Sequence, residues 1–235
     1  MQHPYSRTLA GVPCLIAEPS PALPWDAAVI WCHGFRADAL AHAAELEMCA
    51  EAGFLAVGID AVGHGARGDP GLPGWIASSP NGAMPVMLDL VEQTVREIPA
   101  LIDALHAQYG VRRERVSMVG ISMGAFLGYR SIAAGVKLRA VVALLGAPQW
   151  PGETSAHRSP AAFRNVALLS ITAEHDVSVP PDAVVPFHQQ LASAVPANGV
   201  RRDHHFVLRD SGHLMSADAW QRAMRVTLQW LQRMG

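Results

Sequence analysis

One stretch decides the fold, Val116-Ser117-Met118-Val119-Gly120-Ile121-Ser122-Met123-Gly124. Its apolar first part, Val116–Val119, predicts a buried strand, and the residues from Met123 to Ala134 predict a helix. A turn this tight between a strand and a helix holds Ser122 in a strained backbone conformation, and glycines on both sides remove Cβ atoms that would clash. The serine oxygen then stands clear at the N-terminus of a helix, whose dipole favours negative charge. The pattern predicts a nucleophilic serine; an ordinary glycine-rich turn is the alternative.

Short apolar runs flank this stretch and alternate with segments of helical period. The further strands are expected at Val12–Ala17, Ala28–Cys32, Phe54–Ile59, Val141–Leu145, Val166–Ile171 and His205–Leu208. Strands that are apolar on both faces and separated by helices indicate an α/β fold with a parallel sheet covered on both sides. The 235 residues suit one α/β domain, so we expect a single domain over residues 1–235. In such sheets ligands bind at the carboxyl ends of the strands.

The flanking segments carry further expectations. Val12–Ala17 is predicted to be an edge strand that pairs with residues near Arg7–Ala10. Gly63–Pro85, rich in glycine and proline without a period, is predicted to be a long loop. Val86–Tyr109 is predicted to be helical, with Pro99 kinking the helix or ending its first half. Helices are also expected at Pro181–Val195 and Ala217–Met234.

Composition excludes several classes of protein. The formal net charge is −2, so no global basic field would recruit nucleic acid. No apolar run approaches the roughly 18 residues of a membrane span, and the N-terminus lacks the pattern of a secretory signal, so a cytoplasmic location is the default expectation. The three cysteines, Cys14, Cys32 and Cys49, match no zinc spacing and are expected to be small buried hydrophobic residues. We expect no metal and no cofactor.

A serine hydroxyl needs a base, and His213 is the best candidate. It follows the strand His205–Leu208 through Arg209-Asp210-Ser211-Gly212, which places it on a loop at the carboxyl edge of the sheet. His175 is a competitor because it lies beside the predicted catalytic acid. Among the other histidines, His204 and His205 start a strand at the opposite end of the sheet, His106 lies on a helix, and His3, His157 and His188 lack helpful neighbours.

The imidazole in turn needs a carboxylate that fixes its tautomer, and Asp176 fits this role. It lies in the loop after the strand Val166–Ile171, so the chain order is serine, acid, histidine. Glu174 and Asp210 remain alternatives. For the oxyanion, the amide of Met123 is free at the start of its helix, and the amide of Phe35 is the second candidate donor.

These motifs together resemble the α/β-hydrolase superfamily. The resemblance rests on His33-Gly34-Phe35, Asp60-Ala61-Val62-Gly63-His64-Gly65, Gly120–Gly124, Asp176 with Val179-Pro180, and Ser211-Gly212-His213. Within the superfamily, the chain is similar to small bacterial esterases of the dienelactone-hydrolase and prolyl-oligopeptidase-like branch. The resemblance implies an eight-stranded, mostly parallel sheet and an acyl-enzyme mechanism. It also implies a structural or wall-forming His64, while His33 is expected to form structural hydrogen bonds. With the helices expected on both faces of the sheet, the short interval Gly146–Asn165 predicts a minimal cap.

The resemblance includes one departure and leaves the substrate open. Dienelactone hydrolase uses a cysteine nucleophile where this chain has Ser122, so its lactone is not the expected substrate. The interval Gly146–Asn165 has room for at most a short helix, which favours small or medium acyl groups. The predicted pocket residues are Phe35, Trp75, Trp150 and Val177.

These residues lead to four functional hypotheses. A carboxylesterase acting on a small ester is the first, and an amidase, peptidase or thioesterase with the same three residues is the second. A catalytically inactive binding protein is more remote, because all three residues and both oxyanion positions are retained. A metalloenzyme is weaker still, because His33 and His64 lack the helical i, i+4 spacing of a known zinc motif. The sequence gives no indication of oligomeric state.

Overall fold

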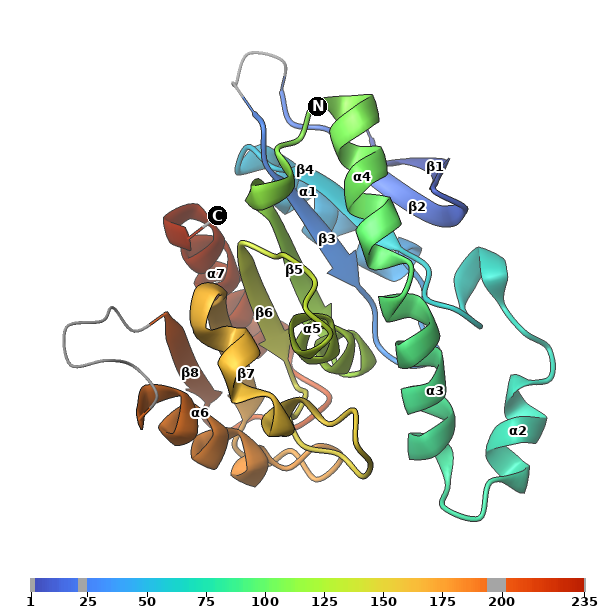
Figure 1. Cartoon of the computed structure of the whole chain (residues 1–235), viewed down its shortest axis with the longest axis vertical. Helices are drawn as coiled ribbons and strands as arrows, with labels where there is room; N and C mark the ends of the chain where they lie inside the picture. The colour runs from blue at the N-terminus through green and yellow to red at the C-terminus, as the bar shows by residue number, and fades with distance from the viewer. Residues whose placement is uncertain (1–2, 21–24, 194–201, 235) are drawn as a thin grey trace.

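The computed structural model describes residues 3–20, 25–193 and 202–234. They form an eight-stranded sheet with the strand order β1-β2-β4-β3-β5-β6-β7-β8 (Figure 1). The strands are β1 Tyr5–Leu9, β2 Val12–Ala17, β3 Ala28–Cys32, β4 Leu55–Ile59, β5 Val116–Ile121, β6 Ala140–Leu144, β7 Ala167–Ala173 and β8 Asp203–Leu208. Only β2 runs antiparallel to both its neighbours, β1 and β4, and all other pairs are parallel. The mostly parallel α/β-hydrolase sheet is confirmed.

Helices cover both faces of the sheet, as predicted (Figure 1). They are α1 Ala43–Glu51, α2 Leu72–Ser78, α3 Ala83–Val95, α4 Ile98–Tyr109, α5 Met123–Ala133, α6 Val184–Ser193 and α7 Ala217–Met234. Apolar residues of α3, α4, α5 and α6 pack with one face of the strands, and those of α1 and α7 pack with the other. Strands β3, β4 and β6 are buried along their whole length, which explains their unbroken apolar sequences.

The first two strands differ from the prediction. The predicted hairpin across Gly11 exists, with Leu9 opposite Val12. However, β2 is not the edge strand, because β1 lies outside it and β4 pairs with its other side. All but one of the β2 residues are buried, which fits an interior strand better than an edge.

The predicted loop Gly63–Pro85 is also partly wrong. It contains α2, and α3 already begins at Ala83. Pro73 and Pro85 lie in the first turns of these helices, where the missing N–H of proline leaves no hydrogen bond broken. The predicted helix Val86–Tyr109 belongs to α3 and α4, and Pro99 lies in the first turn of α4.

The remaining expectations mostly hold. The three cysteines are buried. The interval Gly146–Asn165 contains two short 3-10 turns, Ala156–Arg158 and Pro160–Asn165. The helix expected at Pro181–Val195 is α6, preceded by a 3-10 turn, and Val195 lies outside the described residues. Within the described part of the chain, no helix has both the length and the apolar character needed to span a bilayer.

The strand order places the candidate site. The chain runs from β3 to β4 on one side and then returns to add β5 on the other side of β3, so the order of the strands reverses there. Ligands of open α/β sheets bind at such a reversal, beyond the carboxyl ends of the strands. Cys32 at the end of β3 is in register with Gly120 on β5, so the segments after these strands start side by side. One segment carries Phe35 and the other carries Ser122.

Candidate active site

Ser122 occupies a strained turn between β5 and α5. Its backbone angles are φ 53° and ψ −112°, in a region that L-residues rarely adopt. The turn is held in place because the N–H of Ser122 donates to the carbonyl of Leu144 on β6, at 2.8 Å. The carbonyl of Ser122 then accepts the N–H groups of Ala125 and Phe126, which starts α5. The predicted strand–serine–helix turn is present, with a partly exposed serine at its tip.

The glycines around Ser122 are required by close backbone contacts. A Cβ atom on Gly120 would lie 2.0 Å from the carbonyl oxygen of Gly124. A Cβ atom on Gly124 would lie 2.1 Å from the carbonyl oxygen of Cys32 on β3. Neither backbone oxygen can move without shifting a strand or a helix, so only glycine fits both positions.

His213 lies between Ser122 and Asp176, as predicted. Its Nε2 is 3.1 Å from Oγ of Ser122, and its Nδ1 is 2.8 Å from Oδ2 of Asp176. An ionised carboxylate only accepts hydrogen bonds, so Nδ1–H donates to Asp176 and Nε2 is left to accept the serine proton. The other carboxylate oxygen accepts the N–H groups of Ser178 and Val179 at 2.9 and 2.8 Å. The Asp176 side chain is 1% exposed, so both its oxygens are buried and hydrogen-bonded.

The loop after β3 lies directly against the serine. A Cβ atom on Gly34 would be 3.8 Å from the Cβ of Ser122. The N–H of Ala37 donates to the carbonyl of Gly34 at 3.1 Å, which closes a turn with Phe35 at its second position. This bond does not use the N–H of Phe35. The amide of Met123 is the first of α5, where helix geometry leaves the N–H without an intrahelical acceptor.

Two buried histidines support the loop that carries Phe35. His33 accepts the N–H of Ala61 through Nε2 at 3.1 Å, and its Nδ1 lies 2.8 Å from the carbonyl oxygen of Gly34. The His64 ring lies 5.1 Å from that of His33 and 5.4 Å, edge on, from that of Phe35. Burial lowers the pKa of both histidines, which favours the neutral rings that these contacts need. These contacts fit the structural roles expected for His33 and His64.

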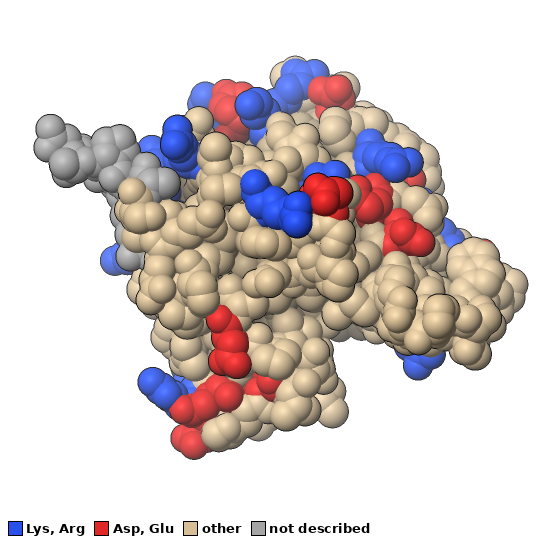
Figure 2. All heavy atoms as spheres, turned by 60° about the horizontal axis from the view of Figure 1, so that its bottom comes forward, with Lys and Arg blue, Asp and Glu red and all other residues tan. Residues whose placement is uncertain are grey.

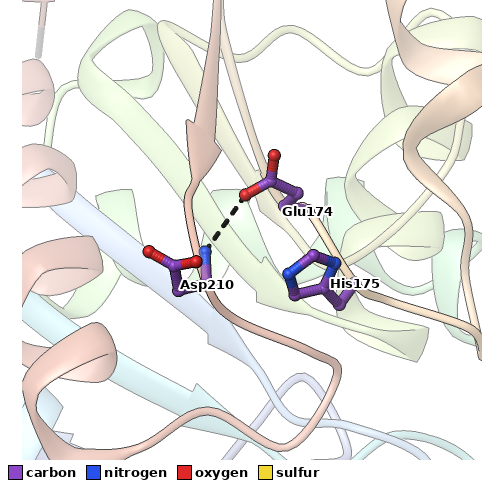
Figure 3. A group of neighbouring side chains, drawn as sticks. All are labelled: Glu174, His175 and Asp210. Atoms are coloured by element: carbon purple, nitrogen blue, oxygen red, sulfur yellow. Dashed lines mark hydrogen bonds between the residues drawn. The ribbon is translucent and has the colours of Figure 1, made fainter.

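The residues that competed for the acid and base roles form a separate group. Figure 3 shows Glu174, His175 and Asp210 together on the loops after β7 and β8. Glu174 accepts the N–H of Asp210 at 3.1 Å and the guanidinium of Arg209 at 2.6 Å, and these contacts lower the pKa of its carboxyl group. Among the described residues this group offers metal-ligating atoms within 4.8 Å of one another, but both oxygens of Glu174 are already bound. The hydrogen bonds of Glu174 join the loop after β7 to the loop after β8.

The predicted pocket residues are less well placed than the reacting ones. Val177 is 90% exposed, so its side chain does not form a pocket wall. Trp150 is 5% exposed because its ring packs edge on against Phe126 of α5, although its margin borders a hollow of about 630 Å³. Trp75 is 50% exposed on α2, which projects beside α3 (Figure 1). Phe35 is the one predicted wall residue in a loop that touches the serine turn.

The surface around the site has little charge. Figure 2 shows the face toward which the strand ends point, and side chains other than Lys, Arg, Asp and Glu cover most of it. The surface is indented between two projecting parts, one of which carries a group of acidic side chains.

One group of hydrogen-bonded side chains was not predicted from the sequence. In this group His188 lies between Ser170 and Asp203. These residues come from a helix and two strands, and no local motif links them. The only available signal was the presence of polar side chains in segments that are otherwise apolar.

Solved structures share the fold over nearly the whole chain. TT1662 from Thermus thermophilus is 22% identical with a TM-score of 0.81, and the match covers 100% of this chain and 98% of that one. Esterase Pf2001 of Pyrococcus furiosus is 16% identical with a TM-score of 0.69, covering 99% and 92% of the two chains. A puromycin-hydrolyzing peptidase of Mycobacterium tuberculosis is 15% identical with a TM-score of 0.75, and the match covers 98% of this chain but 39% of the peptidase. No curated protein matches by sequence.

The family follows from the sequence match. Residues 12–235 match the dienelactone hydrolase family, a span that includes the Ser122 turn, both loops after β7 and β8, and the loop that carries Phe35. The protein is therefore a hydrolase of the α/β-hydrolase fold, and the chain belongs to the dienelactone hydrolase family.

Proposed function

We propose that the protein is a serine carboxylesterase that cleaves small to medium acyl esters through an acyl-enzyme. The observation that carries this proposal is the position of His213, with Nε2 3.1 Å from Oγ of Ser122 and Nδ1 2.8 Å from Asp176. A hydroxyl is a weak nucleophile until a base within hydrogen-bond reach takes its proton, and this geometry supplies the base.

In the first step, Oγ of Ser122 attacks the ester carbonyl carbon while Nε2 of His213 takes the hydroxyl proton. The carbonyl oxygen becomes an oxyanion, and the amides of Phe35 and Met123 are the proposed donors to it. Asp176 stabilises the imidazolium through Nδ1–H. Collapse of the intermediate breaks the bond to the alkoxy group, which receives the proton from His213 and leaves as the alcohol.

In the second step, water attacks the acyl carbon of the ester on Ser122. His213 takes a proton from this water, and a second oxyanion forms in the same place. When the bond to Ser122 breaks, the serine oxygen recovers the proton from His213 and the carboxylic acid leaves. All the groups that this cycle needs are side chains or amides of the chain itself.

The substrate class is supported by two further observations. Between β6 and β7 the described residues form only short 3-10 turns, and such a small cap supports small to medium acyl groups. Charged side chains are sparse over the face that carries the strand ends, which suits a neutral ester (Figure 2).

The test is turnover of p-nitrophenyl esters with acyl chains of two to eight carbons, combined with labelling by a fluorophosphonate. We expect hydrolysis that is fastest on the shorter chains, and labelling of Ser122. The Ser122→Ala variant should lose about 10⁴-fold or more in kcat and all labelling, with an unchanged unfolding midpoint. Absence of turnover and labelling in the wild-type protein would end the esterase proposal. Faster turnover of matched anilides or thioesters would redirect it to an amidase or thioesterase.

A further inference from the structure

A second Ser–His–Asp arrangement lies inside the molecule. Nδ1 of His188 on α6 is 2.5 Å from Oδ2 of Asp203 on β8, and Nε2 is 2.7 Å from Oγ of Ser170 on β7. The same two ring nitrogens face the same two groups as in His213. Ser170 is fully buried and the side chains of His188 and Asp203 are 5% and 7% exposed, so no substrate reaches this arrangement. Its role must therefore be exercised through the structure around it.

A tyrosine extends the arrangement to a fourth element. The hydroxyl of Tyr129 on α5 lies 2.6 Å from Oγ of Ser170, and Tyr129 is fully buried. Burial raises the pKa of its phenol, which keeps the proton on the oxygen as a hydrogen-bond donor. The bonds then run in one direction, from Tyr129 to Ser170, from Ser170 to His188 and from His188 to Asp203. In this direction each of these donors meets an acceptor.

The connected elements are those that carry the candidate catalytic residues. α5 begins at Met123, directly after Ser122. β7 leads into the loop with Asp176, and β8 leads into the loop with His213. One buried chain of hydrogen bonds thus joins α5, β7 and β8, and His188 of α6 lies in the middle of this chain.

A parallel contact strengthens the same junction. His205 on β8 lies 2.8 Å from Oγ1 of Thr172 on β7, and its ring stacks on that of His188 at 5.6 Å with an interplanar angle of 16°. Removing one partner from such a network leaves buried polar groups unsatisfied, at a cost of about 1–3 kcal/mol each. The relative position of β7, β8 and α5 is therefore strongly constrained at this level of the sheet.

We infer that Ser170 and His188 are positioning residues that hold Ser122, Asp176 and His213 in register from beneath the active site. This inference rests on the proposed function for its kinetic consequence. The loops above the network are short, since Asp176 lies three residues beyond β7 and His213 five residues beyond β8. A displacement of the network residues would therefore also displace the loops that carry Asp176 and His213. A displacement of about 1 Å in a reacting group can cost about 10²-fold in rate.

The test compares three network variants with a variant of similar instability elsewhere. Tyr129→Phe removes the phenol hydroxyl at the start of the hydrogen-bond chain and keeps the ring. Ser170→Ala removes the hydroxyl that links Tyr129 of α5 to His188. His188→Gln replaces the imidazole in the middle of the chain. The control is Leu105→Ala, which opens a cavity under α4, a helix that carries none of the candidate residues. kcat, KM and the urea midpoint of each variant would be measured with a p-nitrophenyl ester.

We expect a loss in kcat of about tenfold for Ser170→Ala and His188→Gln and about twofold for Tyr129→Phe, with KM unchanged. Leu105→Ala should be destabilised yet keep its kcat. If the network variants lose stability but turn over ester as fast as Leu105→Ala, the residues are merely structural and the inference fails. Tyr129→Phe keeps the test decisive even if the other variants do not fold.

A spectroscopic readout separates this inference from the proposed function. The Nδ1–H protons of His213 and His188, each bonded to a buried carboxylate, should give two far-downfield proton NMR signals. Ser170→Ala should broaden or shift the His213 signal, whereas Leu105→Ala should not. A wild-type protein that shows both signals but no hydrolysis would contradict the esterase proposal alone. An unchanged His213 signal in Ser170→Ala would contradict the positioning role alone.

Discussion

The molecule contains two Ser–His–Asp arrangements with the same pattern of hydrogen bonds and different surroundings. In the first, His213 links Ser122 to Asp176 at 3.1 and 2.8 Å, on loops beyond the strand ends. In the second, His188 of α6 links Ser170 of β7 to Asp203 of β8 at 2.7 and 2.5 Å, between the helix and the sheet. The side chain of His213 is 23% exposed and that of His188 is 5% exposed.

This difference shows that three residue types at hydrogen-bond distance do not make a catalytic site. Ser122 lies in a strained turn beside two candidate oxyanion amides, and its hydroxyl has no tyrosine bonded to it among the described residues. Ser170 lies within a regular strand, and its oxygen already faces both His188 and the hydroxyl of Tyr129. Exposure to solvent and nearby candidate oxyanion amides are what make the Ser122 arrangement, and not the Ser170 arrangement, the candidate active site.

The largest test of the comparison replaces each carboxylate with an amide. Asp176→Asn should lower kcat by about 10⁴-fold, because an asparagine N–H facing Nδ1 favours the wrong tautomer of His213. Its unfolding free energy should change much less. Asp203→Asn should instead cost about 1–3 kcal/mol of stability, as expected for disrupting a buried hydrogen bond to a carboxylate, and about tenfold in kcat. Urea unfolding and ester turnover measure both quantities. Equal losses of kcat in the two folded variants would erase the distinction.

The second test concerns the strained turn, which the buried arrangement lacks. Gly124→Ala places a methyl group 2.1 Å from a backbone oxygen of β3 and should cost about 3 kcal/mol or more. Gly128→Ala in the same helix meets a methyl group of Val141 at 3.0 Å, a less severe contact than one at 2.1 Å with backbone, and should cost about 1 kcal/mol. Thermal unfolding of the two variants checks this order. Equal stability in both would mean that the backbone of the turn is not tightly constrained.

The smallest effect is a pH dependence of stability at the buried arrangement. Burial, followed by the charges of His188 and His204, lowers the pKa of His205 from 6.5 to about 4. Because the unfolded chain binds this proton more readily, the stabilisation is present above pH 6.5 and is lost as the pH falls toward 4. His205→Gln can still accept a hydrogen bond from Thr172 but cannot titrate in this range.

Between pH 7.5 and 4.5 the wild-type protein should lose about 1 kcal/mol more stability than His205→Gln, a value reduced because the ring is partly exposed. Urea midpoints at both pH values measure the difference. Identical pH profiles would show that His205 is not constrained in its neutral form by this junction.

Much of the candidate site was predictable because its parts follow local rules. The turn around Ser122 is specified by five consecutive residues whose glycines are demanded by backbone contacts. Asp176 and His213 could be selected because polar residues directly after parallel strands meet at one edge of a sheet. The three competitors on the same loops, Glu174, His175 and Asp210, could be ranked below them only from distances, since sequence spacing does not say which way a side chain points.

Other predictions failed where a residue type is compatible with more than one local structure or side-chain environment. α2 was predicted as loop because Gly63–Pro85 is rich in glycine and proline without a period, yet proline is well tolerated in the first turn of a helix, where Pro73 lies. Trp150 was predicted as a pocket wall, and its ring is buried against α5. Val177 was predicted beside it and is almost fully exposed. Trp150 and Val177 do lie outside helices and strands, as predicted, but the directions of their side chains depend on neighbours distant in sequence.

The sequence alone determined the α/β class, the serine turn and the chain order of the candidate catalytic residues. These depend on apolar periodicity and on turn geometry, which act over fewer than about ten residues. Only the tertiary structure decided that His188 joins Ser170 and Asp203 and that β2 is interior. Such contacts join segments tens of residues apart, and they form because burying apolar strands forces any polar side chain between them to find a partner.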